Sequence, residues 1–571
     1  TEIVIDTVEA TSDDVNITQS GVATDDTLTF TLKTATAGTA IVFDEFTADG
    51  FETLTINSTG KDSAATVVKN TITGVNGTAT DKNLVLSGDK KLTVADVEAT
   101  WTNIDITNTV GVDITIAGAT GLDVLGGPGA DRIELANKAD VNVNDKLNGG
   151  AGSDTLAFTA ADDLEAADFT TAAIAAISNF EIIEFEGAQN LTSAGTGTDT
   201  VDLTKIAGVN TLKITGTLTT DTDDLLVIKA ESGAKIVLGG AVVHNTTLAD
   251  IQIKNAANAG TTDSVTIAME KESAGAALAI AGFGIDNVET LNLEVKGVMA
   301  ASDIISLGDV DGAQLQTINL TSTAGITTAT GVAKTAESLT ITTVESTLLK
   351  TFDATGYTGV LDITGLATKF SALGATITGS SAANTITGGV GADLIVTGKG
   401  ADTILGGTGN DDVTSGGGID TVLLSTGLDP TPEADGTVVS GIYANTDTIF
   451  ATIAGKKITF TTTGAGVAPA AAGLKAAIIA DVDLNNLTTS VISTTNATND
   501  TLTVTYKVDG NFTDITFGTI TIGTGAVSAI TNVQGTNSTS IDTASLGAGA
   551  DFVHTGGGID VLDLGGSDNL V

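Results

Sequence analysis

Acidic residues recur every nine positions in a glycine-rich stretch, residues 379–423, where they are spaced for binding a cation. Five copies of the pattern G-G-x-G-x-D-x-U-x, in which U is apolar, run there without a gap. The first copy is degenerate and has Asn384 at the acidic position, and the other four have Asp393, Asp402, Asp411 and Asp420. The apolar positions, two residues further on, are Ile386, Ile395, Ile404, Val413 and Val422. A flexible glycine-rich linker predicts neither period, so we interpret the stretch as a folded repeat.

The pattern predicts a β-roll whose turns hold calcium. Glycines permit tight turns, and each x-U-x triplet forms a short strand with U pointing inward. Two nonapeptides make one coil, so Asp393 should face Asp411, and Asp402 should face Asp420. Each pair would share an ion with turn carbonyls, and Asn384 with Asp402 would form a weaker site. We expect the carbonyl ligands to come from Gly388, Val390, Gly406 and Thr408.

Ligation by oxygen alone favours calcium over zinc or magnesium. Without an ion, stacked aspartates would repel by about 4 kcal/mol per pair at a surface-like dielectric. We therefore expect several Ca²⁺ ions to be required for folding.

Two further blocks carry the same pattern. In the first, Gly126–Glu134 and Gly149–Ala157 contain Asp131 and Asp154, which lie 23 residues apart and could stack directly. Nine residues from each lie Asp140 and Asp145, expected to be weaker ligands on the opposite edge. Near the C-terminus the candidate ligands, again nine residues apart, are Asp542, Asp551 and Asp560. Ordinary Gly-Asp turns are the alternative interpretation of both blocks.

Composition narrows the function. The 571 residues carry 70 acidic and 24 basic side chains, a net charge of −46, which excludes nucleic acid as a direct partner. The chain has no cysteine, and no apolar run reaches the ~20 residues of a membrane helix. Neither histidine lies in a zinc-protease motif, and no nucleophile elbow or P-loop is present. We expect no enzymatic activity, although glycosidase-like carboxylate pairs are compatible with so many acidic residues.

Short alternating strands predict an all-β fold of parallel β-solenoid or β-helix segments with calcium-binding β-rolls, and a small β-rich domain with one helix. Strand-like segments beginning at Thr317, Ser338 and Val360 step by roughly 20 residues, as expected if successive coils stack. A β-sandwich with regular loops is the alternative. The helix is expected at Pro469–Leu484.

The period divides the chain into five predicted regions. They are a β-rich solenoid ending in a repeat block (1–160), a β-solenoid (161–378), the β-roll (379–423), an inserted β domain with the helix (424–536) and a C-terminal repeat block (537–571).

The repeats resemble those of the RTX family, in which they bind calcium after type I secretion. Within it the chain looks most like surface-layer (S-layer) proteins of Gram-negative bacteria. That likeness rests on a phrase in which Glu follows an apolar residue and precedes a strand, at Phe51-Glu52, Phe180-Glu181 and Val288-Glu289, and on Phe352-Asp353-Ala354-Thr355. No family-type anchor precedes Thr1 and no secretion signal follows Val571, so we expect one or both to be missing or anchoring to differ.

The resemblance implies a secreted, extracellular protein that self-assembles into a calcium-dependent two-dimensional layer on the bacterial cell surface. Its partners would be copies of itself and, through a region not seen in this sequence, lipopolysaccharide. The alternatives are an RTX adhesin that binds a host or partner surface, and a secreted hydrolase with accessory repeats.

Overall fold

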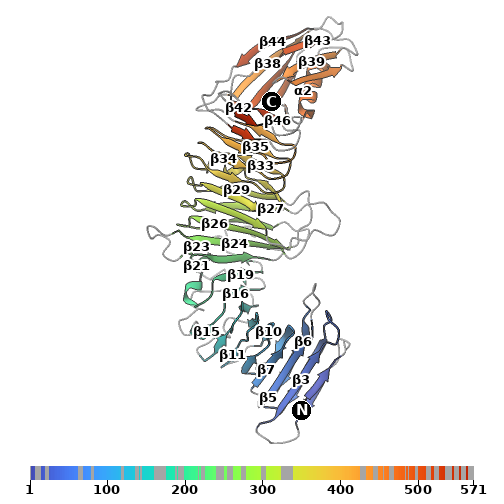
Figure 1. The fold of residues 1–571 in the computed structure, drawn as a ribbon, viewed down its shortest axis with the longest axis vertical. Coiled ribbons are helices and arrows are strands. Elements are labelled where there is room, and N and C mark those ends of the chain that lie inside the picture. The colour runs from blue at the N-terminus through green and yellow to red at the C-terminus, as the bar shows by residue number, and fades with distance from the viewer. Residues whose placement is uncertain are drawn as a thin grey trace. The chain divides into compact units, whose positions relative to one another are not determined.

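The structure is a computed structural model of the 571-residue chain, and its strands form mostly parallel sheets (Figure 1). It describes residues 2–563 except 7–13, 20–24, 62–67, 79–82, 118–120, 136–140, 142–143, 160–174, 187–188, 191–198, 216–217, 220–225, 240–249, 254–261, 272–277, 298–303, 323–337, 425–431, 441–447, 454–455, 462–467, 482–483, 486–487, 496–498, 510–515, 520–525, 534–542, 546–551 and 555–560. The chain divides into two compact units, the first comprising mainly residues 1–299 and the second mainly residues 300–571.

The first unit is a parallel β-solenoid in which the chain alternates between sheets. One sheet contains β1 (Glu2–Ile5), β3 (Thr27–Lys33), β5 (Thr53–Thr59), β7 (Asn83–Gly88), β9 (Asn103–Ile106), β11 (Asp123–Leu125), β13 (Lys146–Asn148) and β15 (Ile177–Ser178). The next contains β2 (Val15–Thr18), β4 (Val42–Asp49), β6 (Asn70–Gly77), β8 (Leu92–Val97), β10 (Val112–Ile116), β12 (Arg132–Leu135), β14 (Thr155–Phe158), β16 (Ile182–Phe185), β19 (Thr211–Ile214), β22 (Ala234–Leu238), β24 (Ser264–Lys271) and β26 (Thr290–Gly297). Later coils contribute β18 (Asp199–Asp202), β21 (Leu226–Ala230), β23 (Asp250–Ile253) and β25 (Leu278–Gly284), with the short pair β17 (Gln189–Asn190) and β20 (Leu218–Thr219).

The core of the first unit lies between the sheets. Strand β5 alternates buried and half-buried residues, as period-2 patterning requires. Phe30 of β3 packs against Phe43 and Phe46 of β4, with ring centroids 5.2 and 4.2 Å apart. These contacts join the two sheets by apolar packing.

The solenoid of the second unit has two parallel sheets. The first contains β28 (Thr317–Ser322), β30 (Thr351–Gly356), β32 (Thr376–Thr378), β34 (Leu394–Val396), β36 (Asp412–Thr414), β45 (Thr543–Ser545) and β47 (Val561–Asp563). The other contains β29 (Ser338–Val344), β31 (Val360–Asp362), β33 (Asn384–Thr387), β35 (Thr403–Leu405), β37 (Thr421–Leu423) and β46 (Phe552–His554). The residues of β27 (Ile304–Asp311) are divided between the two units.

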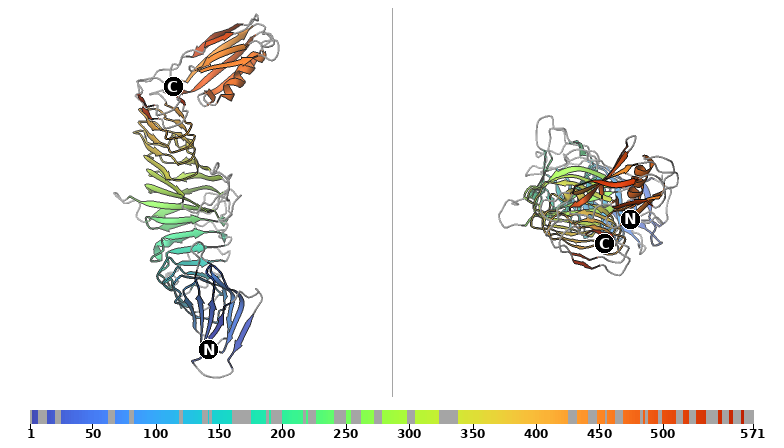
Figure 2. Two further views of the ribbon diagram at one scale, coloured as in Figure 1. Left: turned by 45° about the vertical axis from the view of Figure 1, so that its right-hand side comes forward. Right: turned by 90° about the horizontal axis from the view of Figure 1, so that it is seen from above.

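Between β37 and β45 the chain forms antiparallel sheets and a helix. One sheet has the order β41 (Thr488–Thr495), β42 (Asn499–Asp509), β38 (Pro432–Ser440), β44 (Ala526–Val533), and the other β40 (Lys456–Thr461), β39 (Thr448–Ile453), β43 (Thr516–Thr519). Helix α2 (Ala468–Ala480) lies against these strands (Figure 2) and buries Leu474 and Ile478. The helix expected at Pro469–Leu484 is present and ends at Ala480.

The predicted all-β solenoid with one helix is confirmed, and the parallel pairing rules out the sandwich alternative. The interpretation that the segments at Thr317, Ser338 and Val360 stack in succession is wrong in part. Thr317 pairs with Thr351, whereas Ser338 pairs with Val360 in the other sheet. Each coil contributes a strand to both sheets, so consecutive strands lie on opposite sheets. None of the helices in the described ranges has the length and hydropathy of a membrane-spanning helix.

Candidate calcium centres

The repeat strands of the second unit stack with a coil of 18 residues. Ile395 of β34 pairs with Val413 of β36, and Ile404 of β35 pairs with Val422 of β37. All four side chains are fully buried. Strands β34, β35 and β36 each bury one residue of the triplet, β37 buries all three, and the stacked residues form the core between the two sheets.

Glycines let the turns of successive coils approach closely. Gly409 has φ 142°, and a Cβ there would lie 1.8 Å from the carbonyl oxygen of Gly391 in the coil before. The Gly389 oxygen would lie 2.2 Å from a Cβ on Gly407. Any larger residue would collide with backbone here. The carbonyls of Gly389 and Gly391 thus point at the following turn, and the sequence prediction missed them.

The four predicted carbonyl ligands occupy this same pair of turns. The Gly406 oxygen lies 1.9 Å from where a Cβ of Gly388 would be, so it points into the space between turns. Thr408 pairs with Val390 in a parallel bridge, and its oxygen accepts a hydrogen bond from the Gly391 N–H at 2.6 Å. Thr408 therefore uses its carbonyl partly to join the two coils.

The aspartates form two columns, one on each edge of the roll. The N–H of Asp393 donates to Asp411 Oδ1, and that of Asp402 donates to Asp420 Oδ1, both at 3.0 Å. None of the four is more than 2% exposed. The structure thus places together the pairs that the nine-residue spacing matches.

Burial makes the ionised form of these carboxylates costly. It raises the pKa of Asp393 and of Asp402 above the usual range. The opposing hydrogen bonds come from backbone N–H groups at Asp393, and at Asp402 from the Thr397 side chain first and then from Asn384. A bound cation would remove this cost, because its charge favours the ionised carboxylate.

Asn384, at the degenerate acidic position, has its own set of hydrogen bonds. Its Oδ1 accepts from the Ser380 N–H at 2.8 Å, and its Nδ2 donates to the Ala382 oxygen at 2.7 Å and to Asp402 Oδ1 at 2.9 Å. The amide nitrogen therefore bridges a turn carbonyl and a carboxylate, which is the bridging role expected of a cation elsewhere. The weaker site predicted for Asn384 and Asp402 remains a prediction.

Asp131 and Asp154 stack directly in the first unit. Strands β12 and β14 pair with Arg132 opposite Thr155, and the Asp131 N–H donates to Asp154 Oδ1 at 2.8 Å. Asp131 accepts N–H groups from Val112 and Gly127 at both oxygens.

Asp154 differs from Asp131 in having a carboxylate oxygen to spare. Its Oδ2 is buried and accepts no hydrogen bond within the described part of the chain. Burial, with the charges of Asp131 and Glu181 nearby, raises the pKa of Asp154 to about 6. A buried, ionisable oxygen with no donor fits a metal ligand.

The remaining predicted ligands lie elsewhere or outside the described residues. Asp145 is buried on another edge, where its Oδ1 accepts from the N–H groups of Gly121 and Leu122 at 3.0 and 2.8 Å. The predicted ligands outside the described residues are Asp140, Asp542, Asp551 and Asp560. The strands directly after the last three are described, and β45, β46 and β47 pair with β36, β37 and β45.

These donor sets fit calcium. Within the described ranges, no three His, Asp or Glu side chains converge on one point. Side chains alone therefore would not complete a site there, and backbone carbonyls must contribute. Carboxylate plus carbonyl oxygen is the ligand chemistry of Ca²⁺.

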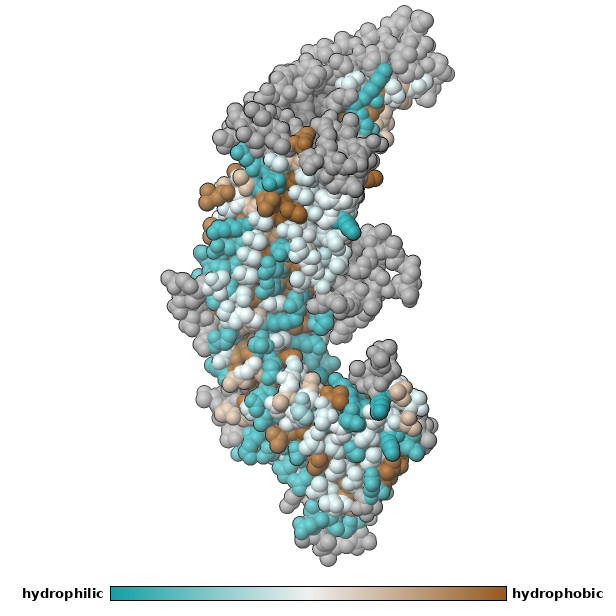
Figure 3. Space-filling model, viewed as in Figure 1, coloured by the Kyte–Doolittle hydropathy of each residue, from teal (hydrophilic) through white to brown (hydrophobic). Residues whose placement is uncertain are grey.

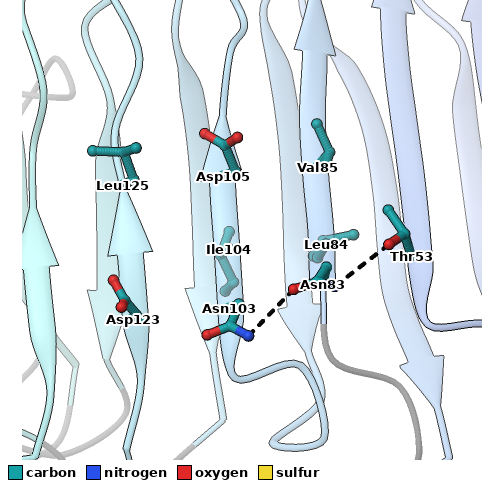
Figure 4. A pocket seen from close by; sticks show the side chains of 9 residues that line it. All are labelled: Thr53, Asn83, Leu84, Val85, Asn103, Ile104, Asp105, Asp123 and Leu125. Carbon is teal, nitrogen blue, oxygen red and sulfur yellow. Dashed lines mark hydrogen bonds between the residues drawn. The ribbon is translucent and has the colours of Figure 1, made fainter. Parts of the chain in front are cut away.

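A shallow hollow of about 450 Å³ lies on the outer face of β5 to β11 (Figure 4). Asn103, Asp105, Asp123 and Leu125 are among the residues that line it. Asp123 forms an exposed ion pair with Lys146 at 2.8 Å.

Comparison with known proteins identifies the repeats. The family model of the RTX calcium-binding nonapeptide repeat matches four times, at residues 144–164, 375–404, 387–422 and 538–571, which is less than half of the chain. A search of curated proteins gave no match. The matches cover Asp154 and the whole array from Asn384 to Asp420. The chain therefore carries RTX calcium-binding nonapeptide repeats, which bind several Ca²⁺ ions and indicate a secreted, extracellular calcium-binding protein.

Proposed function

We propose that this chain is the structural subunit of a calcium-dependent two-dimensional surface layer that self-assembles on a bacterial cell. The observation that carries the proposal is the placement of the repeats. They are part of the solenoid in both units, between β12 and β14 and again from β33 to β47. Calcium then stabilises both units and not only an accessory tail.

A layer also requires surfaces that bind other copies. At the turns of the second unit, Leu373 is 91% exposed and Val390 is 56% exposed, and Leu394 is exposed nearby. Figure 3 shows hydrophobic residues at the surface near β33 and β34. Exposed apolar side chains at the edges of turns support lateral contacts between copies of the chain. We propose separately that lipopolysaccharide anchors the layer to the cell.

Calcium would couple assembly to location. Inside the producing cell, low free calcium leaves the repeats unfolded and competent for type I secretion. Outside, extracellular calcium modules bind at roughly 10⁻⁴ to 10⁻³ M, so millimolar calcium drives folding by mass action. The protein would act by shape and contact, and not by catalysis.

Electron microscopy of the purified protein tests the proposal. With millimolar calcium we expect regular sheets, and with a chelator none. Vesicles containing lipopolysaccharide should recruit these sheets, whereas vesicles of phosphatidylcholine should not. Isolated particles that form in calcium and bind host cells would refute the surface-layer proposal and favour an adhesin. Hydrolytic activity that a single carboxylate substitution abolishes would favour an enzyme.

A further inference from the structure

The Glu of the phrase described above accepts the N–H of the aspartate one coil before. The three bonds, each 2.8 Å, run from Asp26 to Glu52, from Asp154 to Glu181 and from Asp263 to Glu289. At Glu181 the aspartate belongs to a nonapeptide turn, so there the phrase continues the acidic column with a side chain one methylene longer than aspartate.

Glu181 ends the stack that begins at Asp131. Ile182 of β16 pairs with Thr155 of β14, so Glu181 follows Asp154 in register. Asp154 Oδ1 binds the Asp131 N–H, and Glu181 Oε2 binds the Asp154 N–H, both at 2.8 Å. Glu181 is half-buried, so solvent reaches this end of the column.

Asn179 supplies a carbonyl where a nonapeptide turn supplies one from glycine. Asn148 pairs with Ser178, which places Asn179 opposite Gly149. The Asn179 oxygen lies 2.1 Å from where a Cβ of Gly149 would be, much as the Gly149 oxygen lies 1.8 Å from that position on Gly126. Asn179 has φ 55°, a conformation that non-glycine residues rarely adopt. The Asn179 carbonyl therefore follows that of Gly149 in register, one coil beyond the last glycine turn.

Asp154 has a spare carboxylate oxygen at this end of the column. Its side chain is 0% exposed, and its Oδ2 has no hydrogen-bond donor among the described residues. Gly149 lies against both groups, because a Cβ on it would come 2.7 Å from the Asp154 Cβ and 2.1 Å from the Asn179 oxygen. The Asp154 side chain and the Asn179 carbonyl therefore lie beside the same glycine. A buried carboxylate oxygen beside a carbonyl and a second carboxylate is a set of hard donors for a divalent cation.

We propose a calcium site between the last nonapeptide turn of the first unit and the short turn that follows it, with ligands from Asp154, Glu181 and the Asn179 carbonyl. Water completes the coordination on the exposed side. The site differs from one between two glycine turns, because Glu181 replaces the second aspartate. It does not depend on the surface-layer proposal.

The chain contains a matched control in Glu52. This residue makes the same 2.8 Å bond to the N–H of Asp26. The Asp26 carboxylate, however, accepts a hydrogen bond from Gln19 Nε2 and is only half-buried, and no nonapeptide turn precedes it. Glu52 therefore caps a backbone N–H without a ligand set beside it.

The test counts Ca²⁺ ions per chain by atomic emission after gel filtration in saturating calcium. Glu181→Gln keeps an oxygen for the Asp154 N–H and removes the charge, and it should bind one ion fewer than the wild type, whereas Glu52→Gln should bind the same number. An unchanged count in Glu181→Gln, in protein with wild-type circular dichroism, would overturn the proposal.

Glu181→Asp provides a second measurement should the glutamine variant fail to fold. The charge remains, but the shorter side chain does not reach both the Asp154 N–H and the ion. Titration with Tb³⁺ should then show at least a tenfold weaker affinity at one site. Wild-type affinity at every site would exclude Glu181 as a ligand.

Discussion

The charge at Asp411 should have opposite effects on stability with and without calcium. Successive strands of a sheet lie about 4.8 Å apart, and Asp393 and Asp411 stand one above the other on that spacing. Two ionised carboxylates at this distance repel by about 3.5 kcal/mol at an effective dielectric constant of about 20. A calcium ion shared by the two carboxylates would reverse the sign of this contribution by placing positive charge between them.

Asp411→Asn isolates the charge. The asparagine keeps an oxygen for the Asp393 N–H, which donates at 3.0 Å, and Asn384 shows that an amide is accommodated at such a position. In chelator we expect the variant to be more stable than wild type by up to about 3.5 kcal/mol. In millimolar calcium it should be less stable, with a calcium midpoint at least about tenfold higher, or about 1.4 kcal/mol.

Hydrogen exchange of peptides covering residues 403–424 measures this locally, because exchange reports the opening free energy of each segment. The control is Asp412→Asn, an exposed neighbour on β36 that should change stability by less than about 0.5 kcal/mol in either buffer. A change of the same sign for Asp411→Asn in both buffers, or equal effects of the two variants, would refute the shared-ion model.

Three further expectations concern pH, backbone and ion pairing. Without calcium, acidification from pH 7 through 6 toward 4 should stabilise the coil at Asp154, because the folded state, with a pKa of about 6, binds the proton more tightly than the unfolded chain; exchange that accelerates over this range would contradict the burial argument. Gly409→Ala should cost more than about 2 kcal/mol in chemical denaturation, since its φ of 142° and nearby carbonyl exclude a side chain, and a neutral result would mean that the turns are looser than described. Arg132→Ala should destabilise the first unit by about 2 kcal/mol, because it leaves the buried Glu184 with one cation fewer, whereas Lys146→Ala at an exposed pair should leave the melting temperature nearly unchanged; equal melting shifts would contradict this.

The sequence was most informative where the coil length is set locally. Between Asn384 and Asp420 each nine-residue unit contains its own turn and strand. The nine-residue repeat in the sequence is therefore also the repeat of turns and strands in the structure. The pairing of Asp393 with Asp411 was therefore predictable from spacing alone. The same holds for Asp131 and Asp154, whose 23-residue separation is one coil.

Elsewhere the coil length varies, so the spacing between two segments no longer predicts whether they pair. The strand at Thr317 pairs with that at Thr351, whereas the strand at Ser338 pairs with that at Val360. Alternating apolar residues show that a strand has a buried face, but they do not show to which of two sheets it belongs. The ligand role proposed for Glu181 was not predictable for a related reason, because the sequence shows the Glu phrase but not which N–H its side chain binds one coil before.

The two kinds of turn suggest why calcium dependence is local. An aspartate in a six-residue glycine turn lies deep between coils, where Asp411 is 1% exposed. Glu52 accepts the equivalent backbone N–H, that of Asp26, from a short turn that contains Phe51. There the buried ring of Phe51 takes the place of the glycine loop. The first arrangement concentrates charge, so we expect it to require a cation, whereas the second buries apolar surface and should not. Coils β3 to β8, joined by Phe30 and its aromatic neighbours, should therefore keep their protection in chelator while the coils β34 to β37 lose theirs. On this reasoning a secreted chain would have segments that fold at any calcium concentration beside segments that fold only after export.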